Sequence, residues 1–121
     1  MPDTNRVVFV VDDEPVIAKT LAIILNQSGF NAHAFENPEE AIAASSDIAP
    51  DLLISDVMMP GMTGIELAIQ FKTMQPECKV LLFSGQAATS DLLEKAREHG
   101  HEFELIPKPV HPADLLARLR A

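Results

Sequence analysis

The sequence has a single cysteine, few basic residues and no long apolar run. Because Cys78 is the only cysteine among 121 residues, an internal disulfide is excluded and a reducing cytoplasm is favoured. No apolar stretch reaches the roughly 18 residues that a membrane helix needs. The first residues also lack the apolar core of a signal peptide. We therefore expect a cytoplasmic protein that makes no membrane contact.

Basic side chains are outnumbered by acidic ones. The chain carries 9 Lys and Arg against 18 Asp and Glu, which gives a net charge of −9. Such a surface is repelled by phosphate backbones, so direct contact of this domain with nucleic acid is disfavoured. The hydrophobic share of 47% excludes a disordered chain, and the length suits one domain with one core system.

Short apolar runs alternate with helical patterns five times along the chain. The expected strands cover residues 7–11, 31–35, 52–55, 80–83 and 103–106. The expected helices run over 15–28, from 37 to about 46, from 63 to about 74, over 90–99, and from 112 to the end. This alternation predicts a parallel sheet that is covered by helices on both faces.

Several of these helices carry signals at their ends. Pro15 suits a first helical position and Gly29 suits the position just past a helix end. Asn37 is a typical N-cap residue, and Thr63 with Glu66 forms a capping-box pattern. These signals support the expected helix boundaries independently of the apolar pattern.

Polar side chains follow four of the five expected strands at their carboxyl ends. Asp12 and Asp13 follow the first strand, Asp56 follows the third, and Ser84 and Lys108 follow the fourth and fifth. Ligands of doubly wound sheets bind at this edge, where the strand order reverses. We therefore expect these five side chains to share one pocket.

Three clustered carboxylates require a compensating charge. Each like-charged pair at ~4 Å costs about 4 kcal/mol at an effective dielectric of 20, before screening. Mg²⁺ would remove this cost, since it prefers oxygen ligands and accepts phosphate as a co-ligand. Lys108 and the Ser84 hydroxyl would then hold phosphoryl oxygens, and Asp56, the most central acid, is the candidate nucleophile.

Four motifs in this order carry a family resemblance: VVDDEP, LLISDVMMPGMTGIEL, LLFSG and PKP. Over about residues 6–121 the chain resembles the receiver domains of response regulators, the chemotaxis-regulator-like modules of two-component signalling. The resemblance implies a flavodoxin-like, doubly wound (βα)5 three-layer sandwich with a five-stranded parallel sheet of strand order 2-1-3-4-5. It also implies that residues 1–121 form one receiver domain.

The resemblance assigns roles around the metal. Asp13 matches the direct Mg²⁺ ligand, and Asp12 matches a residue that supports the ion through water. Asp56 matches the phospho-acceptor, and Met58 matches the residue whose backbone carbonyl binds the ion.

The resemblance also assigns roles around the phosphoryl group. Ser84 matches the hydroxyl that turns toward it, Gly85 matches a position kept small beside the acceptor, and Lys108 matches the phosphate-binding lysine. The bond between Lys108 and Pro109 is expected to be cis, an isomer that is uncommon and usually structural.

The implied function is a switch and not an enzyme in the usual sense. Asp56 would accept a phosphoryl group from a phosphohistidine on a histidine kinase or a histidine phosphotransfer protein. The surface of the fourth helix, fifth strand and fifth helix would then change, with only slow self-phosphorylation and self-dephosphorylation. Dimerisation is possible on that surface, and the output domain or partner is left open.

One feature departs from the family pattern. Leu105 stands where receivers usually carry Tyr or Phe, and the spacing from Gly100 to Lys108 is one residue longer than the common pattern. Phe103 lies two residues earlier and would share the strand face of Leu105. We expect the switch to act through the 86–90 loop, or through Phe103 if the register is shifted.

Two other functions stay open at this stage. The chain could be a degenerate receiver that only docks partners, although the complete acidic set argues against this. It could also be a phosphatase of the haloacid-dehalogenase type, but Met58 stands where such enzymes carry a second acid. The chain is either a piece of a longer regulator or a stand-alone receiver.

Overall fold

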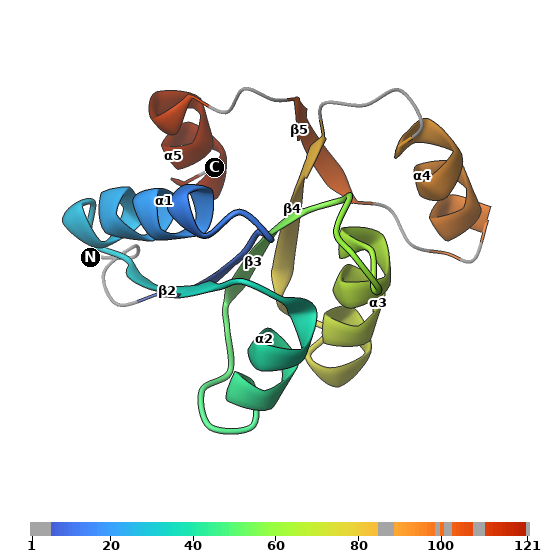
Figure 1. The fold of residues 1–121 in the computed structure, drawn as a ribbon, viewed down its shortest axis with the longest axis horizontal. Coiled ribbons are helices and arrows are strands. Elements are labelled where there is room, and N and C mark those ends of the chain that lie inside the picture. The colour runs from blue at the N-terminus through green and yellow to red at the C-terminus, as the bar shows by residue number, and fades with distance from the viewer. Residues whose placement is uncertain (1–5, 85–88, 99, 101–102, 108–110, 121) are drawn as a thin grey trace.

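The computed structural model describes residues 6–84, 89–98, 100, 103–107 and 111–120. Five strands and five helices alternate along this part of the chain (Figure 1). The strands are β1 (Val7–Val11), β2 (Asn31–Phe35), β3 (Leu52–Asp56), β4 (Lys79–Ser84) and β5 (Glu104–Pro107). The helices are α1 (Pro15–Gln27), α2 (Pro38–Ala44), α3 (Gly64–Met74), α4 (Thr89–Glu98) and α5 (Pro112–Arg120). Among the described helices, none combines the length and the apolar composition that membrane crossing requires.

The five strands form one parallel sheet in the order β2-β1-β3-β4-β5. The chain runs outward from β1 to β2, then crosses back to β3 and continues to β4 and β5. The strand order therefore reverses between β1 and β3, and their carboxyl ends frame the switch point of the sheet. This arrangement confirms the predicted doubly wound sheet and its predicted strand order.

Helices cover both faces of the sheet and complete three layers. Helices α1 and α5 lie on one side, and α2, α3 and α4 lie on the other (Figure 1). Successive side chains of a strand point to opposite faces of the sheet. Val8 and Val10 pack toward α1 and α5, whereas Phe9 and Val11 pack toward the opposite helices. Because both faces are covered, the strands read as continuous apolar runs.

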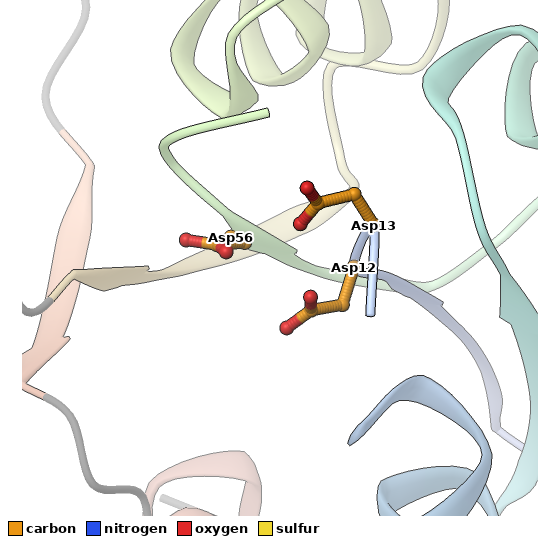
Figure 2. Close-up of side chains that lie close together, drawn as sticks. All are labelled: Asp12, Asp13 and Asp56. Carbon is orange, nitrogen blue, oxygen red and sulfur yellow. The ribbon is translucent and has the colours of Figure 1, made fainter. Parts of the chain in front are cut away.

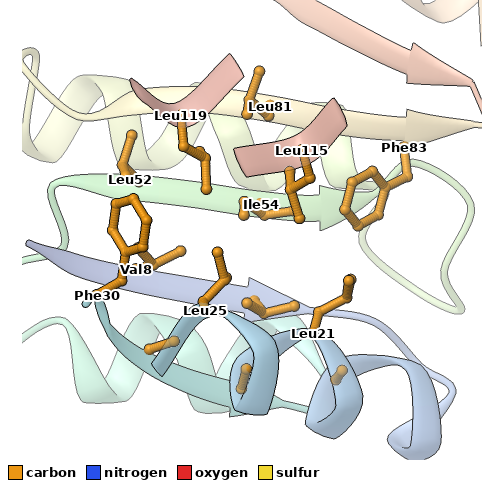
Figure 3. Packing of buried hydrophobic residues seen from close by; sticks show 14 of the residues in the cluster. Val8, Leu21, Leu25, Phe30, Leu52, Ile54, Leu81, Phe83, Leu115 and Leu119 are labelled. Atoms are coloured by element: carbon orange, nitrogen blue, oxygen red, sulfur yellow. The ribbon is translucent and has the colours of Figure 1, made fainter. Parts of the chain in front are cut away.

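The core on the α1 and α5 side joins segments that are far apart in the sequence. Figure 3 shows Leu21 and Leu25 of α1 beside Leu115 and Leu119 of α5, all directed at the sheet. Leu25, Leu115 and Leu119 are completely buried. This packing holds the first and last helices side by side on the sheet.

The core on the opposite side is built around aromatic rings. Phe9 of β1 lies 4.8 Å from Phe35 and 6.1 Å from Phe71 of α3, measured between ring centroids. The ring of Phe71 stands nearly perpendicular to that of Phe9, at 75°, an arrangement favoured by the charge distribution of aromatic rings. Phe9 therefore ties β1 to its neighbour β2 and to the helix that follows the loop after β3.

The helix signals in the sequence act as expected. Pro15 opens α1, and Gly29 has a φ of +99° just beyond the end of that helix. The Asn37 side chain accepts a hydrogen bond from the backbone N–H of Glu40. At α3 both bonds of the capping box between Thr63 and Glu66 are present.

Some predicted boundaries were wrong by one or two residues. β3 includes Asp56 and β4 includes Ser84, because the ladders to the neighbouring strands continue through both residues. β5 begins at Glu104, so Phe103 precedes the strand. α2 ends at Ala44, where the Ser45 hydroxyl donates a hydrogen bond to a helix carbonyl and competes with further helix.

Two basic side chains bind the carboxyl end of α5. The Lys79 ammonium donates to the backbone carbonyl of Arg118 at 3.0 Å, and a guanidinium N–H of Arg6 donates to that of Leu119 at 3.2 Å. These carbonyls have no partner within the helix, and a positive charge is favourable at this end of the helix dipole. The amino ends of β1 and β4 thus anchor the last helix.

We expect Lys79→Met to lower the free energy of unfolding by about 0.5–1.5 kcal/mol, since one charge-assisted hydrogen bond is lost while the apolar stem is kept. Urea unfolding measures the change. Lys19→Met, at an exposed position of α1, is the matched control and should change the stability by less than about 0.5 kcal/mol. Equal effects in the two variants would show that the anchoring bond contributes nothing.

Candidate functional site

Three carboxylates meet beyond the ends of β1 and β3. Asp12 and Asp13 directly follow β1, and Asp56 is the last residue of β3. One carboxylate oxygen from each residue lies within 4.8 Å of the others (Figure 2). The cluster therefore lies at the switch point of the sheet, as the sequence predicted for these three residues.

The three acids differ in burial and in backbone support. Asp12 is completely buried and Asp56 is 7% exposed, whereas Asp13 is exposed. The backbone N–H of Glu14 donates to Oδ1 of Asp12 at 2.9 Å, and the N–H of Asp12 donates to the carbonyl of Phe35 at 3.1 Å. The turn between β1 and α1 thereby holds Asp12 in place, while Asp13 faces the solvent side of the cluster.

The loop after β3 begins with backbone contacts around Asp56. The backbone N–H of Val57 donates to the carbonyl of Phe83 at 3.0 Å and so continues the ladder to β4. The N–H of Met58 lies 3.4 Å from Oδ1 of Asp56, at the long end of hydrogen bonding. Met59 packs into the core, whereas the Met58 side chain is 41% exposed beside the cluster.

The donor set fits a hard divalent cation. It consists of carboxylate oxygens alone, which Mg²⁺ and Ca²⁺ prefer over nitrogen or sulfur. One oxygen from each acid lies within 4.8 Å of the others, so the three acids are close enough to share one ion. A cation would also remove the mutual repulsion of three negative charges at partly buried positions.

Of the residues predicted to surround the phosphoryl group, the structure describes Ser84. Ser84 ends β4, is 7% exposed and pairs in register with Pro107 of β5. Gly85, Lys108 and Pro109 lie outside the described residues, so their predicted roles stay predictions. The next strand from Asp56 thus brings the Ser84 hydroxyl to the same edge of the sheet.

Leu105 and Phe103 both lie on the α2, α3 and α4 side of the sheet. Each is half-buried and packs against the aromatic core of that side. The expectation that they share a face is confirmed, although Phe103 precedes β5 and does not belong to it. Leu105 pairs in register with Leu82 of β4.

Two neighbours of Asp56 were not predicted from the sequence. The Ser55 hydroxyl donates to the backbone carbonyl of Asp56 at 2.9 Å, and Gly64 lies directly against the same peptide group. The one signal in the sequence was a glycine in the first turn of an expected helix. Its spacing of eight residues from the acid gives no indication of contact, because the loop path decides it.

Cys78 lies at the opposite end of the sheet, just before β4. It is 2% exposed and borders a hollow of about 550 Å³ lined by residues 49–51 and 75–78. Burial raises the pKa of this thiol from 9.0 to about 11. The thiol therefore stays protonated at neutral pH and is a poor nucleophile.

Comparison with known proteins gives one consistent family. The family model described as response regulator receiver domain matches residues 8–120. Among curated proteins, the chain is 32% identical over 114 residues to the probable transcriptional regulatory protein TcrX of Mycobacterium tuberculosis, covering 94% of this chain and 48% of that protein. It is 30% identical over 119 residues to the phosphate regulon transcriptional regulatory protein PhoB of Pseudomonas aeruginosa, covering 97% and 51%. The chain thus spans about half the length of these relatives.

Solved structures share the fold. A CheY-like receiver domain protein of Methanospirillum hungatei has a TM-score of 0.85 at 24% identity, covering 97% of this chain and 92% of the other. The response regulator protein TrrA of Thermotoga maritima, solved in complex with Mg²⁺ and beryllofluoride, has a TM-score of 0.79 at 29% identity. That comparison covers 95% of this chain and 96% of TrrA.

Millimolar Mg²⁺ should raise the melting temperature of the protein, because an ion that binds only the folded state stabilises it by mass action. We expect Asp13→Asn to weaken the apparent Mg²⁺ affinity by about tenfold or more, since it removes one charged ligand. Thermal melts over a Mg²⁺ series and amide spectra report the binding.

The control for this experiment is Asp47→Asn, which makes the same chemical change at an exposed turn after α2. It should leave the Mg²⁺ response unchanged. If Mg²⁺ moves neither the melting curve nor the amides near Asp56 in the unaltered protein, the three acids do not form a metal site.

Proposed function

We propose, from the premise that this chain belongs to the response regulator receiver domain family, that it is a phospho-acceptor switch whose acceptor is Asp56. Receiver domains are signalling modules of two-component systems and not enzymes in the usual sense. The observation that carries the proposal is the placement of Asp56 within 4.8 Å of two further carboxylates at the switch point of the sheet.

The proposed chemistry is transfer of a phosphoryl group to a carboxylate. An oxygen of Asp56 forms a bond to phosphorus while the bond from phosphorus to the donor histidine nitrogen breaks. The electron pair of the broken bond stays on the imidazole, which takes up a proton from solvent. Because Asp56 is only 7% exposed whereas Asp13 is exposed, the donor would approach from the side of Asp13.

Asp12, Asp13, Asp56 and the backbone carbonyl of Met58 would hold a Mg²⁺ ion. When bound, the ion offsets the negative charge that the acids and the phosphoryl oxygens bring together. The similar TrrA structure supports this assignment, because it was solved in complex with Mg²⁺ and beryllofluoride, a mimic of a phosphoryl group.

The other assigned residues act on the phosphoryl group. Ser84, at the end of the neighbouring strand, would donate its hydroxyl to a phosphoryl oxygen. Lys108 would supply a positive charge, and its bond to Pro109 would be cis. Gly85 would leave room beside the acceptor. Of these four residues only Ser84 belongs to the described part of the chain.

The proposed partners follow from the chemistry and from the relatives. The donor is a histidine kinase or a histidine phosphotransfer protein, since its phosphohistidine supplies the group. The names of the relatives describe transcriptional and DNA-binding regulators, so control of an output domain or partner is proposed here too. With a net charge of −9, residues 1–121 would act as one cytoplasmic receiver domain that does not itself touch nucleic acid.

The two alternative functions receive less support. A phosphatase of the haloacid-dehalogenase type needs a second acid two residues after its nucleophile, and Met58 occupies that position with a half-exposed apolar side chain. In a docking module that is not phosphorylated, three neighbouring carboxylates at one sheet edge would lower the stability through their mutual repulsion and would contribute nothing to the function.

Incubation with acetyl phosphate and Mg²⁺ should add one phosphoryl group, on Asp56. Asp56→Asn should abolish the modification, because an amide is not a nucleophile under these conditions. Intact-protein mass and borohydride trapping of the acyl phosphate locate the group.

Asp47→Asn, on the surface of the protein, is the matched control and should be modified like the unaltered protein. Label on any other residue of the unaltered protein would overturn the assignment of Asp56. Steady turnover of p-nitrophenyl phosphate would instead indicate a phosphatase, and no modification at all would indicate a docking module.

The response to phosphorylation should bypass Leu105. This side chain is aliphatic and half-buried, so it has no ring to move toward the acceptor. Beryllofluoride with Mg²⁺ should therefore shift the amides of residues 86–90 more than the amide of Leu105, as measured by heteronuclear spectra. Large changes centred on Leu105 with residues 86–90 unmoved would contradict this expectation.

Phe103→Leu separates the two routes for the switch. If the ring of Phe103 carries the response, the variant loses the shifts in α4 that beryllofluoride produces. If residues 86–90, the last two of which belong to α4, carry it, the shifts remain. Ile69→Leu is a suitable control, because Ile69 borders the same core from α3.

A further inference from the structure

We infer that Gly64 is a positioning residue for the acceptor: the absence of a side chain there lets α3 close onto the peptide group between Asp56 and Val57. The inference rests on the proposed function, because it concerns how the acceptor carboxylate is held. Gly64 is the first residue of α3 and is separated from Asp56 by the loop of residues 57–63.

The first observation is steric. A Cβ atom at Gly64 would overlap the carbonyl oxygen of Asp56 and would lie 2.9 Å from its carbonyl carbon and 3.0 Å from the Cα of Val57. All three neighbouring atoms belong to the backbone, so no side-chain rotation relieves the overlap. Any residue with a side chain at this position must displace the backbone of the acceptor or of the helix.

The reason for glycine at this position is therefore space and not conformation. Gly29, Gly61 and Gly100 have positive φ angles of 99°, 80° and 86°, and a Cβ on any of them would meet no atom within 4 Å. Gly64 is helical and is not among these positive-φ residues. Its constraint is the approach of the helix to Asp56.

The second observation is that the same peptide group is held on its other sides. The Ser55 hydroxyl donates to the carbonyl of Asp56 at 2.9 Å, and the N–H of Val57 donates to the carbonyl of Phe83 at 3.0 Å. The N–H of Gly64 donates to the carbonyl of Val57 at 2.8 Å and closes the loop. The backbone on which the acceptor side chain stands is thus enclosed by β4, by Ser55 and by α3.

α3 is held more firmly than the loop of residues 57–63, so the helix would move less if a side chain were added at Gly64. Its start is fixed by the two bonds between Thr63 and Glu66, and Leu67 and Phe71 are completely buried in the core. A side chain at Gly64 would therefore push on the Asp56–Val57 peptide. Asp12 and Asp13 follow β1, on a different segment of the chain, and would not move with this peptide, so the distances between the three carboxylates would change.

The experiment compares Gly64→Ala with Gly29→Ala. Both changes should lower the melting temperature, the first through overlap and the second through a strained positive φ at the end of α1. Only Gly64→Ala should weaken Mg²⁺ binding and slow phosphorylation by acetyl phosphate. We expect each loss to be about 10- to 100-fold, as for displacements of about 1 Å in a reacting site.

Ser55→Ala provides a second test that introduces no overlap. It should reduce the phosphorylation rate in the same direction but by a smaller factor, with little loss of melting temperature. Ser45→Ala is its control, because the Ser45 hydroxyl makes a comparable bond to the carbonyl of Ile42, at the end of α2. This pair keeps the inference testable if Gly64→Ala does not fold.

Two results would overturn the inference. One is a folded Gly64→Ala variant whose Mg²⁺ affinity and phosphorylation rate equal those of Gly29→Ala. The other, if Gly64→Ala does not fold, is a Ser55→Ala variant that behaves like Ser45→Ala. If the unaltered protein accepts no phosphoryl group, the proposed function fails, and the Mg²⁺ affinities and the amide shifts around Asp56 still decide the role of Gly64.

Discussion

Three carboxylates repel one another at one edge of the parallel sheet, and the rest of the structure has to hold them together against this repulsion. Two unit charges at 4 Å repel by about 1 kcal/mol in bulk water and by about 4 kcal/mol at an effective dielectric of 20. Asp12 and Asp56 are almost wholly buried, so water alone does not screen them fully. The arrangement is destabilising unless a cation offsets it, and this cost is the physical basis of the Mg²⁺ site that we propose.

The rest of the fold keeps these acids in place. β1 and β3 are completely buried through most of their length, between the core of α1 and α5 and the aromatic core of the opposite helices. Packing of this kind stabilises the domain by an amount that exceeds the local repulsion, since each fully buried large apolar side chain contributes about 1.5–3 kcal/mol. The backbone around Asp56 is then fixed by short-range contacts from Ser55, Phe83 and Gly64. Rigid strands and an enclosed peptide group give a small, directional site at the end of a large core.

Leu105 departs from the aromatic residue that receivers usually carry at this position, and the ring of Phe103 lies on the same face of the sheet. Phe103 and Leu105 both pack toward α4 and its neighbours, so a ring is present on the face where receivers carry one, but two residues earlier. Sequence reasoning placed the two residues on one face because side chains alternate along a strand. It misjudged the start of β5, because strand ends depend on which residues of β4 are available for pairing. Short apolar runs carry no information about the register with a neighbouring strand.

The sequence by itself determined the alternation of strands and helices, the helix caps at Asn37 and Thr63, and the presence of acids at the carboxyl ends of β1 and β3. These features depend on local periodicity and on residues three or four positions apart, which the order of residues reveals directly. Only the tertiary structure decided that Gly64 lies against the carbonyl of Asp56, that Ser55 bonds to the same carbonyl, and that Lys79 and Arg6 anchor α5. The physical reason is that contacts between distant segments depend on loop paths, strand order and strand register, and these are settled by packing both faces of the sheet together.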